Sequence, residues 1–201
     1  MKALFKFLLR KFESYISIGN IEKYKKNGIL KIGKQCEIYE DTIFIVNDKH
    51  SNIQIEIGDN VCIRGKIILY TTSAKVKIGS NVYIGPNSLI ECSNEIIIGN
   101  YVLISSNCNI SDNDSHSIDF IERRCDSINW SMGLSKKDWN HVNSGKITIE
   151  NDCWIGLRSI ILKGVNLQTG SIVGAGSVVT KGTNEFDIVV GNPARVIRNL
   201  L

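Results

Sequence analysis

Residues 147–179 read ITIENDCWIGLRSIILKGVNLQTGSIVGAGSVV, and a large aliphatic residue occupies every sixth position of this stretch. Upstream, the same spacing recurs in four shorter runs. There are 18 such positions, 13 of them isoleucine: Ile32, Ile38, Phe44, Ile57, Ile63, Leu69, Ile78, Ile84, Ile90, Ile98, Ile104, Ile110, Ile149, Ile155, Ile161, Leu167, Val173 and Val179. A period of six fits neither an α-helix nor a plain strand. It is typical of a solenoid whose six-residue units each form one short strand and one turn.

The hexads predict how each coil is built. One large aliphatic side chain per hexad points inward, and the small residue in the fifth position also points inward, near a corner. The frequent glycine after the aliphatic position tolerates turn conformations that a Cβ would obstruct. Three hexads close one coil, so we expect about six coils whose strands pair in parallel at about 4.8 Å. Cys36, Cys108 and Cys153 fall in the small slot, so we expect them to be buried packing thiols.

The composition excludes several classes of protein. A chain of 201 residues has the length of one domain with an appendage, and 33 isoleucines against two prolines favour strands over helices. With 43% hydrophobic and 22% charged residues the chain is not disordered, and a net charge of +4 is too small to indicate nucleic-acid binding. The six cysteines form no CxxC pair, so we expect no metal, no disulfides and a reducing, cytoplasmic compartment.

The ends of the chain depart from the hexad pattern. We assign residues 1–30 to an N-terminal helical segment, 31–190 to the solenoid domain and 191–201 to a C-terminal helix that starts near Pro193. Cations at helical spacing within residues 1–18 predict an amphipathic helix, and Lys6 interrupts its apolar run, which argues against a signal peptide. This helix either caps the open end of the solenoid or lies on an anionic membrane surface, at the inner face of the cytoplasmic membrane.

The hexad pattern stops between residues 117 and 146, which predicts a protruding loop. Two of the three tryptophans, Trp130 and Trp139, lie in it among charged residues that include Arg123. Aromatic rings beside polar groups suit a sugar, and they equally suit contacts to a neighbouring subunit. His116 stands where the regular pattern meets the loop. An imidazole there is suited to take the proton from an attacking hydroxyl near neutral pH.

The hexads over residues 30–199, together with ITIENDCWIGLRSIILKGV (147–165), SIVGAGSVVTKG (171–182) and GNPARVIR (191–198), resemble the hexapeptide-repeat acyltransferases. The resemblance implies an all-β fold, a left-handed parallel β-helix, assembled as a homotrimer with active sites between subunits and with acetyl-CoA as acyl donor. DSHSID (114–119) followed by the WIG motif is similar to the branch of polysialic-acid and capsular-polysaccharide O-acetyltransferases. In that branch a histidine at this point is the base, which implies that role for His116.

The resemblance also implies the residues that hold the acyl donor. The tryptophan of the WIG motif, Trp154, is expected to line the site and pack against the acetyl-pantetheine arm. The expected coenzyme A contacts are Gly156, Leu157, Ala175, Thr180, Lys181, Arg195 and Arg198. On the predicted C-terminal helix the two arginines, three residues apart, would share a face and meet the phosphates.

Two carboxylates are candidates to orient His116. Asp114 precedes it by two residues, and Glu95 lies one coil below by hexad counting. We favour Asp114, and a backbone carbonyl is the third alternative. Trp139, Arg123 and Glu95 are the predicted substrate-binding residues.

The sequence therefore predicts an acetyl-CoA-dependent O-acetyltransferase. Its expected acceptor is a sugar hydroxyl of a surface polysaccharide, such as a capsule or lipopolysaccharide, or of a precursor. Two alternatives stay open. One is N-acetylation of an amino sugar or sugar nucleotide, where the nucleophile needs less deprotonation, and the other is a non-catalytic β-helix scaffold.

Overall fold

The computed structural model describes residues 21–39, 42–46, 54–129 and 137–201. The predicted helix over residues 1–18 and the predicted sugar contact of Trp130 lie outside the described residues. Residues 21–26 are helical, and Ile21 and Tyr24 pack against the hydrophobic core. No described helix is long and apolar enough to cross a membrane.

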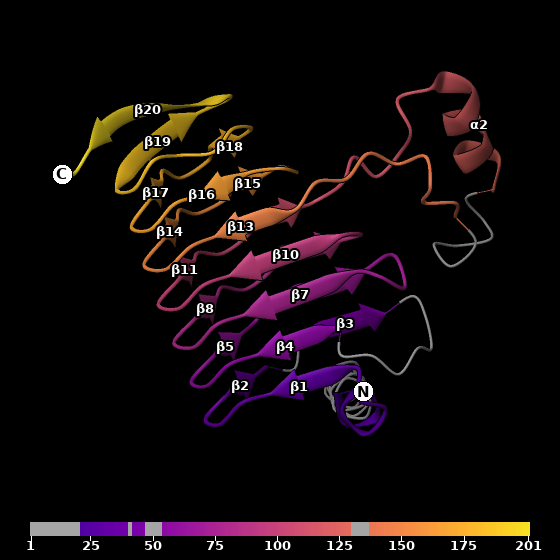
Figure 1. Ribbon diagram of the computed structural model, residues 1–201, viewed down its shortest axis with the longest axis horizontal. Coiled ribbons are helices and arrows are strands. Elements are labelled where there is room, and N and C mark those ends of the chain that lie inside the picture. The colour runs from indigo at the N-terminus through magenta and orange to yellow at the C-terminus, as the bar shows by residue number, and fades with distance from the viewer. Residues whose placement is uncertain (1–20, 40–41, 47–53, 130–136) are drawn as a thin grey trace, which may run out of the picture.

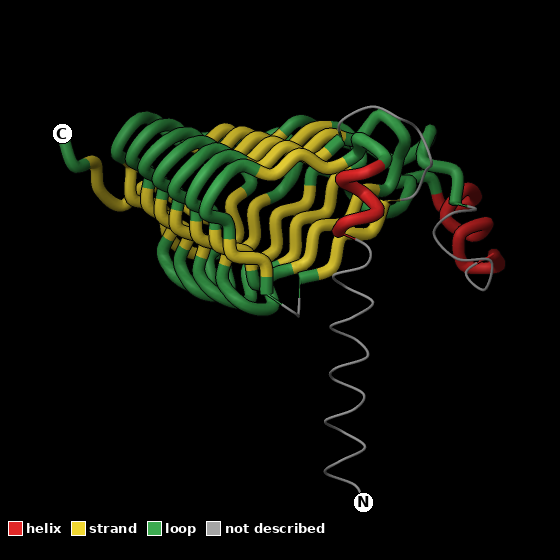
Figure 2. The backbone as a smooth tube through the Cα atoms, turned by 90° about the horizontal axis from the view of Figure 1, so that it is seen from below, coloured by secondary structure: helices red, strands yellow, loops and turns green. Residues whose placement is uncertain are grey.

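Three sheets enclose the solenoid (Figures 1 and 2), and every pairing is parallel until the last strand. The first sheet holds β1 (Leu30–Ile32), β4 (Ile55–Ile57), β7 (Lys75–Ile78), β10 (Glu95–Ile98), β13 (Ile147–Ile149) and β16 (Asn166–Leu167). The second holds β2 (Glu37–Ile38), β5 (Cys62–Ile63), β8 (Tyr83–Ile84), β11 (Leu103–Ile104), β14 (Trp154–Ile155), β17 (Ile172–Val173), β19 (Asp187–Gly191) and β20 (Ala194–Asn199). The third holds β3 (Ile43–Val46), β6 (Lys66–Leu69), β9 (Leu89–Cys92), β12 (Asn109–Ser111), β15 (Ile160–Ile161) and β18 (Val178–Val179). The six strands of the first and third sheets make about six coils, which fits the predicted left-handed β-helix.

The core confirms the hexad prediction, because the aliphatic positions stack coil upon coil in register. In the second sheet Ile63, Ile84, Ile104, Ile155 and Val173 lie directly above one another, each at most 1% exposed. Every coil therefore contributes side chains to one continuous apolar column. Burial of this column supplies most of the stabilisation, at roughly 25 cal/mol for each Å² of apolar surface.

The fifth position of the hexad behaves as predicted within the stack. Cys108 and Cys153 are each 1% exposed. Cys36 differs, since it is only half-buried. It precedes β2, the edge strand of its sheet, so within the described residues no coil covers it from below.

Glycine has a different role from the one predicted. Gly79 has an ordinary φ, but an added Cβ would lie 2.7 Å from the carbonyl of Gly99 on the next coil. The left-handed turn conformation is taken nearby by asparagine, for example Asn81 at φ 59°. Glycine is therefore required here by the close approach of neighbouring coils.

The C-terminal helix predicted for residues 191–201 is wrong. Residues Ala194–Asn199 form β20, which pairs antiparallel with β19. The second sheet offers β19 as an open edge, and pairing satisfies backbone groups that a short exposed helix would leave at its ends. Val196 and Ile197 are β-branched, which favours the extended form.

The interruption of the repeat forms a protrusion outside the solenoid. The chain leaves the third sheet after β12, forms α2 (Phe120–Asn129) and re-enters at β13. Figure 1 shows α2 beyond the ends of β10 and β13, and none of its residues is buried. We call residues 112–146 the insertion, residues 112–119 its outgoing limb and residues 137–146 its returning limb.

Candidate active site

The insertion is tied to the solenoid at its base. Asp112 is fully buried, and its carboxylate accepts hydrogen bonds at 2.8 Å from the backbone N–H groups of Ser93 and Asn94 in the corner below. Its carbonyl accepts the N–H of Gly145 at 2.8 Å, and the N–H of Asp114 bonds the carbonyl of Asn143 at 3.0 Å. Both limbs therefore leave the corner held to each other, and this fixes the position of the backbone that leads to His116.

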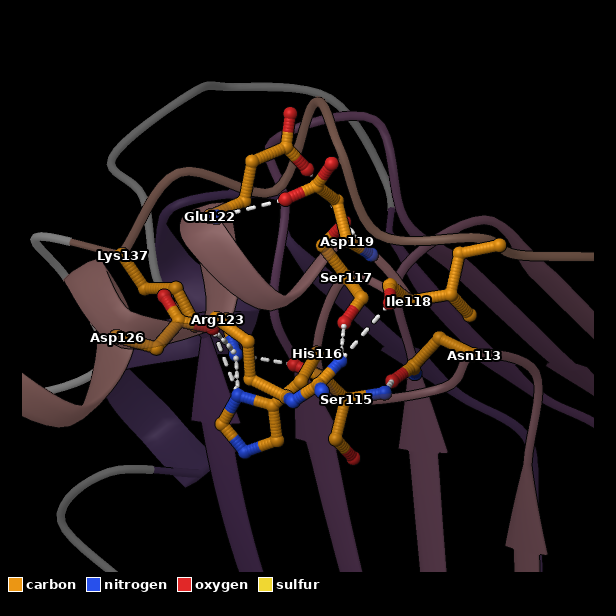
Figure 3. Close-up of polar contacts among 10 residues, drawn as sticks. All are labelled: Asn113, Ser115, His116, Ser117, Ile118, Asp119, Glu122, Arg123, Asp126 and Lys137. Atoms are coloured by element: carbon orange, nitrogen blue, oxygen red, sulfur yellow. Dashed lines mark hydrogen bonds and ion pairs between the residues drawn. The ribbon is translucent and has the colours of Figure 1, made fainter.

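His116 lies at the end of the outgoing limb, with its side chain 54% exposed (Figure 3). Its Nδ1 is 2.7 Å from Oδ2 of Asp126, which is carried on α2. An imidazole that donates Nδ1–H to a carboxylate keeps its lone pair on Nε2 and can act as a general base. The structure thus assembles a histidine–carboxylate dyad from residues ten apart in the chain.

The prediction that Asp114 orients His116 is wrong. The Asp114 carboxylate accepts a hydrogen bond from Nζ of Lys163 at 2.6 Å, and only its backbone carbonyl meets the N–H of His116, at 2.7 Å. The bond to Lys163, which follows β15, holds the Asp114 carboxylate toward the solenoid. Asp126 was not foreseen, because its approach to His116 depends on how α2 folds back over the outgoing limb.

The start of α2 fixes that orientation. Asp119 caps the helix, since its Oδ1 accepts the N–H groups of Ile121 at 2.7 Å and Glu122 at 3.3 Å. The Ser117 hydroxyl donates to the Glu122 carboxylate and accepts the N–H of Asp119 at 3.1 Å. Arg123 donates to the carbonyl of Ser117 at 2.8 Å. Arg123, a predicted substrate contact, is thus engaged in holding α2 to the outgoing limb (Figure 3).

Lys137 brings the returning limb into the same cluster. Its side chain is 10% exposed, and its Nζ lies 3.0 Å from Oδ2 of Asp126 and 3.0 Å from Nδ1 of His116. It also donates to the carbonyl of Ser115. Partial burial acts to raise the pKa of Asp126, but the hydrogen bonds from His116 and Lys137 outweigh it and lower the pKa. Asp126 therefore stays ionised near neutral pH.

The two contacts at Nδ1 of His116 cannot form at once. Nδ1 carries either a hydrogen, which it donates to Asp126, or a lone pair, which accepts from Lys137. Only the first state leaves Nε2 free to accept a proton. Because Lys137 also pairs with Asp126, its ammonium keeps a partner while His116 is in that state.

Trp139 clamps the returning limb to the solenoid. Its ring stacks on Tyr70 with centroids 4.4 Å apart and planes inclined by 18°. Nζ of Lys137 lies 4.9 Å from the centroid of the Trp139 ring. The ring that was predicted to meet a sugar or a neighbouring subunit is therefore held within the chain, where it positions Lys137.

Glu95 lies apart from His116. It opens β10, and its carboxylate pairs with Nζ of Lys146 at 2.8 Å, where the returning limb enters β13. Hexad counting correctly placed Glu95 one coil below the point where the insertion begins. The insertion, however, carries His116 outward from the corner.

A cavity of about 620 Å³ lies where the returning limb faces the corners of the two coils below. Lys137 and Trp139 contribute to its wall, together with residues 70–73 and 93–94. Within the described residues, no group of three or more His, Cys, Asp or Glu side chains is arranged to hold a metal ion.

The predicted donor-side residues occupy the upper coils. Trp154 is 50% exposed on the outer face of β14, in register above Leu103. Gly156 lies against Ala175 of the next coil, and a Cβ at Gly156 would be 2.7 Å from the Ala175 nitrogen. The structure therefore brings the WIG and GAG motifs into contact, with Leu157 exposed beside them.

The remaining predicted cations and Thr180 are exposed near the same end of the solenoid. Thr180 and Lys181 directly follow β18, whereas Arg195 and Arg198 belong to β20. The expected shared helical face of the arginines is wrong, because they lie on a strand opposite Val190 and Ile188.

Known proteins share the repeat pattern of this chain. The family model described as the hexapeptide repeat of succinyl-transferase matches residues 146–181. The probable acetyltransferase Rv3034c of Mycobacterium tuberculosis is 31% identical over 172 residues, 86% of this chain and 50% of that protein. The galactoside O-acetyltransferase of Lactococcus lactis is 28% identical over 180 residues, 90% of this chain and 74% of that protein. Over most of its length the chain is similar to hexapeptide-repeat acetyltransferases.

Solved acyltransferase structures have the same coil architecture. The N-acyltransferase AntD from Bacillus cereus, solved with dTDP and 3-hydroxybutyryl-CoA, superposes with a TM-score of 0.67 at 28% identity, covering 89% of this chain and 87% of that one. The polysialic acid O-acetyltransferase OatWY superposes with a TM-score of 0.66 at 22% identity, covering 85% and 74%. At that identity the second likeness shows the fold alone. The chain spans half the length of the mycobacterial relative.

Proposed function

We propose that this hexapeptide-repeat protein transfers the acetyl group of acetyl-CoA to a hydroxyl of a sugar in a surface polysaccharide or its precursor. The observation that carries the proposal is the dyad of His116 and Asp126, joined at 2.7 Å through Nδ1. It leaves Nε2 of an exposed imidazole available, beside a polar cavity. The galactoside O-acetyltransferase relative supports a sugar hydroxyl as the acceptor.

The dyad accounts for each proton in this reaction. Nε2 of His116 takes the hydroxyl proton while the oxygen attacks the thioester carbonyl, and Asp126 stabilises the imidazolium through Nδ1–H. The tetrahedral oxyanion is stabilised by backbone amides or by the indole N–H of Trp154. When the C–S bond breaks, the proton on Nε2 passes to the departing thiolate. The base is then neutral again for the next cycle.

The donor binds along the upper coils in this proposal. The pantetheine arm lies against the contact of Gly156 with Ala175, next to the exposed Trp154. Lys181, Arg195 and Arg198 meet the phosphates as charge-assisted contacts. The 28%-identical structure with an acyl-CoA supports a coenzyme A donor.

Assembly and location complete the proposal. We expect a homotrimer, because the exposed aromatic and aliphatic residues Tyr83, Leu103 and Trp154 form one outward column on the second sheet, which suits contact with another subunit. We expect the protein in the cytoplasm, where precursors and acetyl-CoA meet, with residues 1–18 as a contact to the inner membrane face.

The test is a transfer screen with acetyl-CoA across mono- and oligosaccharides, read by the mass increase of one acetyl group. His116→Ala should reduce O-transfer by at least about a hundredfold, as expected for loss of a general base. The matched control is His141→Ala. His141 is also an exposed histidine of the insertion. Its Nδ1 lies 3.0 Å from Oε1 of Glu122, which is not part of the dyad. An unchanged rate in His116→Ala would refute the assignment.

The second candidate function is N-acylation of an amino sugar on a nucleotide, which is favoured by the likeness to AntD, an N-acyltransferase also solved with dTDP-4-amino-4,6-dideoxyglucose. An unprotonated amine needs no base to attack, so His116→Ala would then lower the rate far less. A scaffold without catalysis is the third alternative. Isothermal titration with coenzyme A distinguishes it, because only an enzyme shows saturable heat that is lost in a Lys181→Ala, Arg195→Ala double variant.

A further inference from the structure

The cavity beside the returning limb has features that the base chemistry does not use. We call it the corner pocket, formed by the corner residues 70–73 and 93–94 and by residues 137–140 and 144. Its volume of about 620 Å³ lies in the range of small-molecule sites. Two successive coils form its floor, so the floor is rigid.

The side chains on its rim are suited to hydroxyl groups. Thr72, Asn94, Asn140 and Ser144 are exposed at the pocket, and their side chains make no hydrogen bond to any other described residue. Hydroxyl and amide groups both donate and accept, as sugar hydroxyls do. The side chains of Thr71 and Ser93 are instead held in place, by the carbonyl of Ser93 and the carboxylate of Asp112.

The charges at the pocket favour an uncharged ligand. Lys137 is the cation among its lining residues, and its ammonium is already paired with Asp126 at 3.0 Å. Asp138 is exposed on the rim, 3.9 Å from Nε2 of His141. An anionic sugar would meet a neutralised lysine and an exposed carboxylate, so it gains little.

The pocket neighbours the base without containing it. His116 does not line the pocket, whereas Lys137 lines it and also lies 3.0 Å from Nδ1 of His116. A single sugar seated in the pocket would therefore be separated from the base by the Lys137 side chain. Its covalently linked neighbour can extend past that side chain toward Nε2.

We propose that the corner pocket binds an uncharged saccharide unit adjoining the unit that is acetylated, so that the preferred acceptor is at least a disaccharide. This inference rests on the proposed function and specifies its substrate. The aromatic clamp of Trp139 on Tyr70 fixes the limb that separates the two subsites. Binding of the second unit then raises kcat/KM through interactions remote from the reacting hydroxyl.

The experiment measures kcat/KM for acetyl transfer to methyl glycosides of galactose and N-acetylglucosamine, and to their β-linked di- and trisaccharides. We expect a rise of about tenfold or more from monosaccharide to disaccharide, since two or three hydrogen bonds are gained. The double variant Asn94→Ala, Asn140→Ala should remove most of this rise. Asn166→Ala, which changes an exposed asparagine of β16 outside the pocket, should retain it.

A second measurement needs no chemistry. Saturation-transfer NMR of the unreactive disaccharide complex without acetyl-CoA should show protein contacts on both units, and the double variant should lose those of one unit. Equal kcat/KM for mono- and disaccharides would overturn the inference and leave the proposed function intact. Absence of transfer to every saccharide, with binding to the pocket retained, would instead overturn the proposed function.

Discussion

Asp126→Asn tests the dyad directly, because it keeps the shape of the side chain and removes its charge. Charge-assisted hydrogen bonds contribute about 1.5–3 kcal/mol and neutral ones about 0.5–1.5 kcal/mol, so the weaker bond alone costs about 1–1.5 kcal/mol in the transition state. Either the asparagine amide or Lys137 can then donate to the lone pair on Nδ1 of His116, which lies 3.0 Å from Nζ. That arrangement moves the hydrogen to Nε2 and blocks the base, at a further cost of about 1–1.5 kcal/mol for the lost tautomer.

The sum of about 2–3 kcal/mol corresponds to a fall in kcat of roughly 30- to 160-fold. The KM for acetyl-CoA should stay within about twofold, since Asp126 lies in the insertion and the donor-side residues lie on the upper coils. The assay is the initial rate of coenzyme A thiol release with a saturating acceptor, after urea unfolding has shown unchanged stability. The matched control is Asp114→Asn, which breaks only the pair with Lys163. A larger loss in Asp114→Asn than in Asp126→Asn would refute the dyad.

Three further predictions concern the solenoid. Gly156→Ala should lower the free energy of unfolding by about 3 kcal/mol or more, because the added Cβ would lie 2.7 Å from backbone atoms of the next coil. The control Gly176→Ala, at φ 71° with open space around its Cβ, should lower it by only about 1–2 kcal/mol. Urea titrations measure both. Burial raises the pKa of Cys153 to about 11, so iodoacetamide at pH 8 should label the exposed Cys125 and spare Cys153 until unfolding, as mass spectrometry will show. Hydrogen bonds from an asparagine side chain and from a backbone N–H lower the pKa of Asp187, so its stabilisation is complete above about pH 4 and is lost as the pH falls through the lowered pKa. Asp187→Asn should therefore lower the urea midpoint at pH 7, and this difference should shrink as the pH falls through the lowered pKa.

The coils were predictable because the hexad is a local rule. Each aliphatic position meets its counterpart one coil away, so the same spacing that marks Ile104 in the sequence sets its burial in the structure. The rule fails where a neighbour is missing or new. Within the described residues, no coil lies beneath Cys36, which is therefore only half-buried. Residues Ala194–Asn199 pair with β19, and no periodicity in the sequence indicates that pairing.

The site was predictable only at its fixed end. His116 follows the last regular strand before the insertion, so its place could be inferred from where the hexads stop. Asp126 and Lys137 reach it through the cap of α2 by Asp119 and through the stacking of Trp139 on Tyr70. Those contacts form within the insertion or between the insertion and another coil, and no sequence spacing records them.

The division between solenoid and insertion suggests how this family changes its substrate. The donor-side motifs around Gly156 and Ala175 belong to the stacked coils, where a single added Cβ would meet backbone. In the proposed function, the acceptor side comprises the insertion and two corner turns, which are joined to the coils through Asp112 and the Tyr70 stack. No residue of α2 is buried, so the residues of this helix can be replaced without disturbing the core. Transplanting residues 113–144 between family members should therefore transfer the acceptor preference, while the affinity for acetyl-CoA remains that of the recipient coils.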